Sequence, residues 1–182
     1  MTVKEIARSA ALLLQADEIE EALSSEDGGA EDADVKSMVK CVNVAAAELC
    51  SNGFSRLETS ECEATGGVIP LVGLEPAPAR IVEVKRGGAA VPFKCDSRGI
   101  SVKRDGAYTV VYSAAFEDRE LDDELGLCAP MDGNIVSYLA ARNYCLMTGR
   151  TDDAAVWDQM YEREAENARL SRRAAFKPRA WY

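Results

Sequence analysis

The 182-residue chain contains no histidine. Histidine is the commonest general base and metal ligand in proteins, and Ser-His and Cys-His nucleophile pairs require it. The sequence also has no G-x-x-x-x-G-K-[ST] loop and no strand-linked G-x-G-x-x-G pattern, which are the usual phosphate-binding motifs. These absences predict that the chain is not an enzyme and has no catalytic, cofactor-binding or metal-binding residues.

Long apolar runs and paired cysteine motifs are also missing. No stretch of about 18 apolar residues and no secretory signal pattern occurs, so we expect neither a membrane-spanning segment nor a membrane partner. The six cysteines are scattered, with no C-x-x-C pair, and we expect them to be reduced thiols of a cytosolic product. Their even number leaves a disulfide open. They are Cys41, Cys50, Cys62, Cys95, Cys128 and Cys145.

What the chain does contain is typical of one folded domain. Hydrophobic residues make up 47% and charged residues 29% of the sequence, which is a globular composition. The net charge of −10 argues against an electrostatic grip on nucleic acid or on an anionic membrane, because such binding depends on neutralising phosphates with Lys and Arg. We expect a single domain over 1–182.

Two amphipathic helices are predicted at the start of the chain, within 1–54. Thr2 and Glu5 have the spacing of a capping box, and apolar residues then recur at helical intervals, which predicts a helix over about 3–23. The glycines and acidic residues of 24–34 indicate an exposed loop. A second apolar stripe predicts another helix that ends at Gly53.

The middle of the chain, 55–116, has the pattern of antiparallel strands. Val and Ile residues around the Gly87-Gly88 pair predict one hairpin. Asp105-Gly106 predicts the turn of a second hairpin over 99–112. Its second strand should place three residues on one face: Tyr108, Val110 and Tyr112.

Helical periodicity returns over 117–170. One stripe predicts a third helix from about Ile135 to Leu146, closed by Gly149. Thr151 is expected to cap a fourth helix, in which Trp157 and Tyr161 pack against the third helix. The predicted fold class is therefore α+β, mainly α. It combines a four-helix bundle, built from two N-terminal and two C-terminal helices, with an inserted small antiparallel β-sheet and an extended C-terminal arm at 171–182.

Carboxylates cluster in two places, and both clusters have an ordinary explanation. Oxygen ligands could bind a divalent cation or supply an acid and a base over 117–124. The spacing there matches no calcium loop, however, and the acids of 162–166 alternate with Arg163 along a helix. We favour a solvated loop and a solvated helix face over a metal-dependent enzyme.

The C-terminal segment differs from the rest of the protein. From Arg169 onward the chain has five basic residues and no acidic one, whereas the preceding part contains all 31 acidic residues. Exposed arginine and aromatic side chains dominate protein interfaces, so we expect an arm that docks on another chain with an acidic, apolar groove. The expected docking residues are Arg172, Arg173, Phe176, Lys177, Arg179, Trp181 and Tyr182.

Several motifs resemble the head-tail connector proteins of tailed phages, also called adaptor or head-completion proteins. The matching features are Tyr144-Cys145 before a Gly-Arg turn, Ala154-x-x-Trp157-Asp158, Tyr161 one turn later and an Arg-x-Trp-Tyr ending. "GAYTVVY" followed by "LDDEL", and "VKEIARSAALLL" at the start, are similar to other parts of these proteins. The acidic "SSEDGGAEDAD" segment and the six cysteines depart from the family pattern.

The resemblance implies a function for the chain. Such proteins are small helical bundles with an inserted β element, and they form rings, commonly of twelve, between the portal and the tail or stopper in the neck of the virion. Their C-terminal segment reaches into the portal protein. Membership would make the chain a structural virion protein, made in the host cytoplasm. DNA would pass through its acidic lumen without specific binding.

Three alternatives remain open at this stage. One is a stopper, head-closure or tail-completion ring, which should be richer in β-structure. The second is a cytosolic module that binds an acidic partner. The third is a carboxylate-dependent metal enzyme that uses 117–124.

Overall fold

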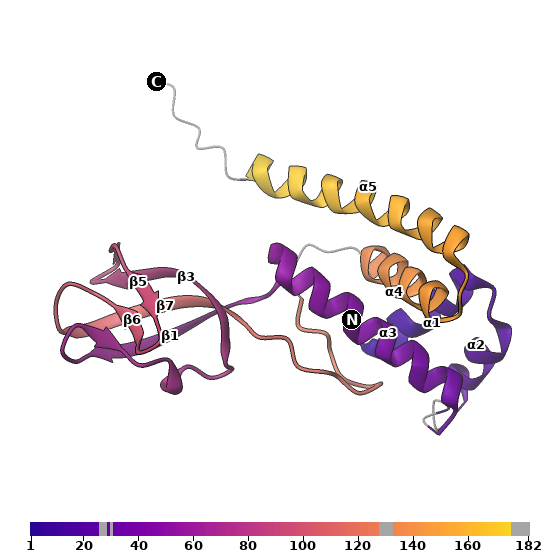
Figure 1. Cartoon of the computed structure of the whole chain (residues 1–182), viewed down its shortest axis with the longest axis horizontal. Coiled ribbons are helices and arrows are strands. Elements are labelled where there is room, and N and C mark those ends of the chain that lie inside the picture. Colours follow the sequence, from indigo (N-terminus) through magenta and orange to yellow (C-terminus); the bar gives the residue numbers. More distant parts are fainter. Residues whose placement is uncertain (26–28, 30, 128–132, 176–182) are drawn as a thin grey trace. The chain divides into compact units, whose positions relative to one another are not determined.

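The computed structural model describes residues 1–25, 29, 31–127 and 133–175, and of residues 171–175 it describes the backbone alone. The fold is α+β, with five α-helices in the described residues and an antiparallel β region, as the sequence predicts. The chain divides into two compact units (Figure 1). The helical unit comprises Met1–Leu49 and Asp118–Tyr182, and the β unit comprises Cys50–Glu117.

The helical unit is built around helix α4. Its helices are α1 (Val3–Leu14), α2 (Asp17–Ser24), α3 (Ala33–Leu49), α4 (Gly133–Met147) and α5 (Thr151–Ala175). Helix α4 packs against α1, α3 and α5. Helix α4 is buried on several sides, whereas an amphipathic surface helix is buried along one stripe. Its buried residues include Ile135, Val136, Leu139, Ala140, Ala141 and Cys145. None of the helices in the described residues is long and apolar enough to cross a membrane.

The prediction of one continuous helix over about 3–23 is wrong, because the structure has two helices there. The capping box is present: the Glu5 amide donates to Thr2 Oγ1 at 3.2 Å, and the Thr2 amide donates to Glu5 Oε2 at 2.8 Å. At Gln15, however, the backbone turns left-handed (φ 54°) and α1 ends. The apolar stripe resumes in α2 with Ile19 and Leu23, so hydrophobic spacing alone does not reveal the break.

The ends of the other predicted helices also differ in detail. Helix α3 ends at Leu49, and one π-helical turn then leads to Gly53 (φ 88°), where the sequence predicts the end. Leu146 of α4 is exposed, although the predicted stripe included it. Helix α5 continues to Ala175, so the prediction of an extended arm from residue 171 is wrong for 171–175. Those five residues contain no proline and include good helix formers.

The β unit contains two antiparallel sheets. Strands β1 (Leu57–Ala64), β7 (Gly106–Ala114), β3 (Pro78–Arg86) and β4 (Ala89–Ala90) form one sheet in that order. Strands β2 (Val68–Ile69), β6 (Gly99–Ser101) and β5 (Lys94–Asp96) form the other, and a short 3-10 turn (Leu71–Gly73) follows β2. Their common core contains Ala64, Ile69, Leu74, Val84, Ile100, Tyr108, Val110 and Tyr112.

One of the two predicted hairpins is confirmed. Gly87 and Gly88, both with positive φ, join β3 to β4. The hairpin over 99–112 is wrong, because β6 pairs with β2 and β5, whereas β7 pairs with β1 and β3. The Asp105-Gly106 signal marks a bend between the two sheets, held by the Gly67 amide, which donates to Asp105 Oδ1 at 2.6 Å. The buried face of β7 is nevertheless the predicted one.

The described cysteines are free thiols. Cys41 and Cys145 are buried in the helical unit. Burial raises the pKa of the Cys41 thiol to about 11, so it remains protonated at neutral pH. Cys95 is exposed on β5, and Cys128 lies outside the described residues.

Candidate protein-docking site

The expected docking residues belong to helix α5 and to the segment that follows it. Arg172 and Arg173 lie in the last turns of α5, where the structure describes the backbone alone. The other five lie outside the described residues: Phe176, Lys177, Arg179, Trp181 and Tyr182. The geometry of α5 therefore determines where this basic, aromatic segment begins.

Helix α5 packs against α4, and its buried residues extend from Ala154 to Ala165. Ala154, Tyr161 and Ala165 are buried, and the Trp157 ring stacks on Tyr138 of α4 with centroids 6.0 Å apart and planes 13° from parallel. Packing of Trp157 and Tyr161 between the last two helices is as predicted. The stacking partner, Tyr138, was not identified, because the spacing within one helix does not reveal the ring opposite it.

An arginine network reinforces this attachment. Arg142 of α4 donates to Asp158 of α5 at 2.9 Å and forms an ion pair with Glu48 of α3. It also donates to the side chain of Asn143, whose amide contacts the Cys41 carbonyl oxygen. Burial lowers the pKa of Arg142, but hydrogen bonds to the two carboxylates outweigh it and the pKa is raised. One charged side chain therefore links three helices.

The far end of α5 extends beyond this attachment. With 25 residues, α5 is ten residues longer than the 15-residue α4, a difference of about 15 Å at the usual rise per residue. Figure 1 shows α5 running past the end of α4. Its outer side exposes Val156, Met160 and Leu170. Helix α5 thus holds the C-terminal segment away from the α4–α5 turn.

The acidic segment 118–124 is attached to the helical unit by its backbone. The Asn43 side chain donates to the Arg119 carbonyl at 2.9 Å and accepts from the Arg119 amide at 3.0 Å. The Val3 amide donates to the Asp123 carbonyl at 3.0 Å. The carboxylates of this segment remain exposed, which fits the predicted solvated loop. Within the described ranges, no group of three or more His, Cys, Asp or Glu residues is placed to hold a metal ion.

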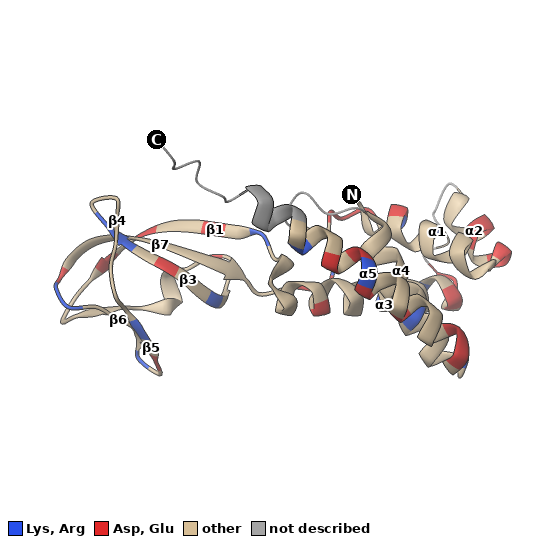
Figure 2. Cartoon of the chain, turned by 90° about the horizontal axis from the view of Figure 1, so that it is seen from above, with Lys and Arg blue, Asp and Glu red and all other residues tan. Residues whose placement is uncertain are grey.

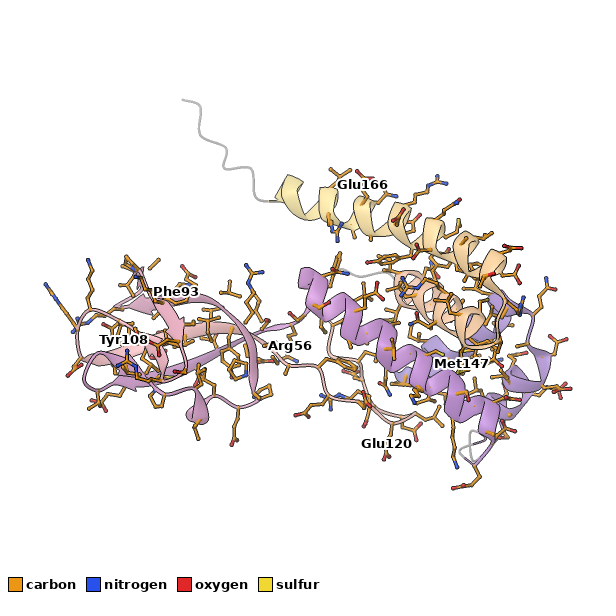
Figure 3. All side chains as sticks on the ribbon, in the orientation of Figure 1. Arg56, Phe93, Tyr108, Glu120, Met147 and Glu166 are labelled. Atoms are coloured by element: carbon orange, nitrogen blue, oxygen red, sulfur yellow. The ribbon has the colours of Figure 1, made fainter. Side chains whose placement is uncertain are left out.

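This segment forms one wall of a groove, which we call the acidic groove. Its lining residues are Val35, Lys36 and Val39 of α3 with Arg119, Glu120, Leu121, Asp122 and Asp123, and its volume is about 500 Å³. Figure 3 shows Glu120 at the edge of the helical unit. Three exposed carboxylates outnumber the two basic side chains of the lining, and Val39 and Leu121 are partly exposed beside them. A basic partner with an apolar side chain would match this chemistry.

The β unit contains a basic stretch that was not among the predicted site residues. The β unit has eight acidic and eight basic residues, so the whole net charge of −10 belongs to the helical unit. The 20-residue stretch 85–104, however, contains six basic residues and one acidic residue, a signal that was visible in the sequence. Figure 2 shows blue segments beside the labels of β4 and β5. We use the name basic surface for the six basic residues of this stretch, of which Lys94 and Lys103 line one pocket. They are Lys85, Arg86, Lys94, Arg98, Lys103 and Arg104.

The basic surface is only partly neutralised. Lys85 pairs with Glu83 at 2.9 Å and Arg98 with Asp96 at 3.1 Å. In the part of the chain that the structure describes, Lys94 and Lys103 form no ion pair.

No protein-family model matches the chain, and no curated protein matches its sequence.

Proposed function

We propose that the chain is a head-tail adaptor of a tailed phage, a structural virion protein that forms a ring below the portal. Its C-terminal segment docks on the portal protein, and its other face carries the tail or the stopper. In this proposal α1 and α2 together take the place of one helix in a four-helix bundle with α3, α4 and α5. The observation that carries the proposal is the long helix α5, which is fixed to α4 and leads directly into the basic, aromatic segment 176–182.

The balance of helix and strand favours an adaptor over a stopper or completion ring. The helices occupy more of the described chain than the strands do, whereas a stopper should be richer in β-structure. The acidity of the helical unit also suits a channel for DNA. Twelve copies would together carry on the order of −120, and DNA in the lumen would meet like charge instead of a basic grip.

Portal binding by the truncated chain tests the proposal. The probe is the portal protein encoded in the same genome, and the variant lacks residues 176–182, so that α5 keeps its last helical turn. We expect a loss of portal affinity of roughly a hundredfold or more, because the aromatic anchors are removed together with the charges. Circular dichroism of the truncated chain should match that of the full chain.

Two paired variants separate the roles expected within the segment. Replacing Lys177 and Arg179 with Ala should mainly slow association and weaken its salt dependence, whereas replacing Trp181 and Tyr182 with Ala should mainly speed dissociation. A matched control replaces Arg163 of α5 with Ala, which should leave portal binding unchanged. Unaltered binding by the truncated chain would contradict the proposed docking mode.

A further inference from the structure

We propose that the basic surface of the β unit binds the acidic groove of a second copy of this chain, so that copies associate head to tail. The inference rests on the proposed ring and supplies its contact between subunits. One copy presents its β unit, and its neighbour presents the segment 118–124 of the helical unit. Neither surface is part of the segment expected to dock on the portal.

The basic side of this contact is a small pocket flanked by lysines. Pro92, Phe93 and Val102 line a hollow of about 270 Å³ together with Lys94, Ser101 and Lys103. Figure 3 shows Phe93 on this part of the β unit. Both lysines are exposed, and neither pairs with a carboxylate among the described residues. The pocket therefore offers two free cations beside an apolar floor, which suits a partner that carries carboxylates next to an apolar side chain.

The acidic side presents that combination. Leu121 is half-buried in the wall of the acidic groove, and exposed carboxylates flank it at Glu120, Asp122 and Asp123. The Glu120 amide donates to Asp123 Oδ2 at 2.9 Å, and the Lys4 amide donates to the Leu121 carbonyl at 2.8 Å. These bonds hold the segment in shape before any partner arrives, which lowers the entropy lost on association.

Charge separation within the chain favours a second copy as the partner. The acidic excess lies on one unit and the basic surface on the other, so like faces of two copies repel and unlike faces attract. A contact between two different faces of identical chains is heterologous. Repetition of such a contact closes a ring when the rotation per subunit allows it.

Nucleic acid is a poorer match for the same surface. The β unit has no net positive charge, because its eight basic residues, including the six of the basic surface, are balanced by eight acidic ones. The acidic helical unit would repel phosphates. The preferred partner is therefore a protein surface with fixed carboxylates. Binding of a duplex DNA probe by the β unit would contradict this preference.

Carbodiimide cross-linking of a mixture of unlabelled and nitrogen-15-labelled chains tests the contact directly. Equal amounts of the full chain with natural nitrogen and with nitrogen-15 are combined at rising protein concentration and low salt, and the reagent joins lysine amines to carboxylates in contact. Mass spectrometry then identifies the linked peptides. We expect light-heavy pairs that join Lys94 or Lys103 to the segment 120–124. Links found solely in light-light and heavy-heavy pairs would place the contact within one chain and overturn the proposal.

Charge reversal tests whether the contact drives association. We expect the pair Lys94→Glu with Lys103→Glu, and separately the pair Asp122→Lys with Asp123→Lys, each to weaken self-association by roughly tenfold or more, measured by sedimentation velocity. An equimolar mixture of the two variants should associate again, since each acidic surface then finds a basic one. Two control pairs change the net charge by the same amounts at exposed positions elsewhere and should have little effect on self-association. They are Lys40→Glu with Arg163→Glu, and Glu162→Lys with Glu166→Lys.

Three further results would overturn the proposal. The first is a full chain that does not self-associate at any concentration tested. The second is self-association that both charge reversals leave unchanged. The third is binding of a duplex DNA probe that the lysine reversal abolishes, with no light-heavy cross-links. Portal binding is measured separately: the chain that lacks 176–182 should keep its self-association, so failure of the ring contact and failure of the proposed function give different results.

Discussion

At the scale of single residues, Arg142 is the side chain whose ion pairs join three helices of the helical unit. Its side chain is 18% exposed, and it contacts Glu48 of α3 and Asp158 of α5. A partly buried carboxylate that loses its cation keeps its desolvation cost without the compensating attraction. The ion pairs therefore fix the positions of α3 and α5 relative to α4.

We predict that Arg142→Ala lowers the free energy of unfolding by about 2 kcal/mol, because two carboxylates then lack their shared partner. Arg142→Lys should recover part of this loss, since an ammonium group cannot reproduce the forked geometry of a guanidinium. Urea denaturation followed by circular dichroism at 222 nm measures the change. Arg163→Ala, an exposed position on α5, serves as the control. Equal effects of Arg142→Ala and Arg163→Ala would show that the network contributes nothing.

Local patterns predicted individual residues well, and contacts between elements were not predictable in the same way. Thr2 and Glu5 are three residues apart, so their capping box can be inferred from spacing alone. The inward face of β7 follows from strict alternation. Tyr138 opposite Trp157, and Glu48 opposite Arg142, are pairs set by how two helices cross, and no spacing within one helix contains that information.

At the scale of elements, the break between α1 and α2 shows how a turn can interrupt an unbroken apolar stripe. Gln15 occupies a left-handed position at the end of α1, and its amide donates to the Leu12 carbonyl at 3.2 Å. Glycine is the usual residue at such a position, because a Cβ atom raises the energy of left-handed backbone. Sequence alone therefore favoured one continuous helix, since the residue at the break carries no turn signal.

We predict that Gln15→Gly stabilises the helical unit by about 0.5 kcal/mol, because glycine adopts positive φ without the steric cost of a side chain. Gln15→Ala keeps that cost and should not stabilise the protein. Thermal unfolding followed by circular dichroism compares the two variants with the unchanged chain. If the glycine and alanine variants unfold at the same temperature, the left-handed turn at Gln15 is not a source of strain.

The second hairpin was mispredicted for a related reason. Asp105-Gly106 is a strong turn signal, and the chain does turn there. Which strands pair after a turn depends on the rest of the fold, and here β7 takes the central place between β1 and β3. Turn chemistry thus identifies where the chain bends, whereas sheet topology depends on contacts between distant segments.

At the scale of the whole molecule, the β unit is an insertion within the helical unit. Its first and last strands are neighbours, with Leu57 paired to Ser113, so the chain enters and leaves this sheet at positions about 5 Å apart. Its core comprises residues of the β unit alone. The sequence predicted this insertion, because the hydrophobic period changes at both ends of 55–116. The separation of charge between the units became apparent after their boundaries were known.

We predict that the helical unit folds when 56–115 is replaced by a linker of about four glycine and serine residues, a length that spans paired strand ends. The shortened chain should unfold cooperatively and show a dispersed amide NMR spectrum, because α1, α3 and α5 keep their contacts with α4. It retains α5 and 176–182 but lacks the basic surface. Portal binding should therefore persist while self-association is lost, and a shortened chain that is folded and still self-associates would exclude the β unit as the source of the ring contact.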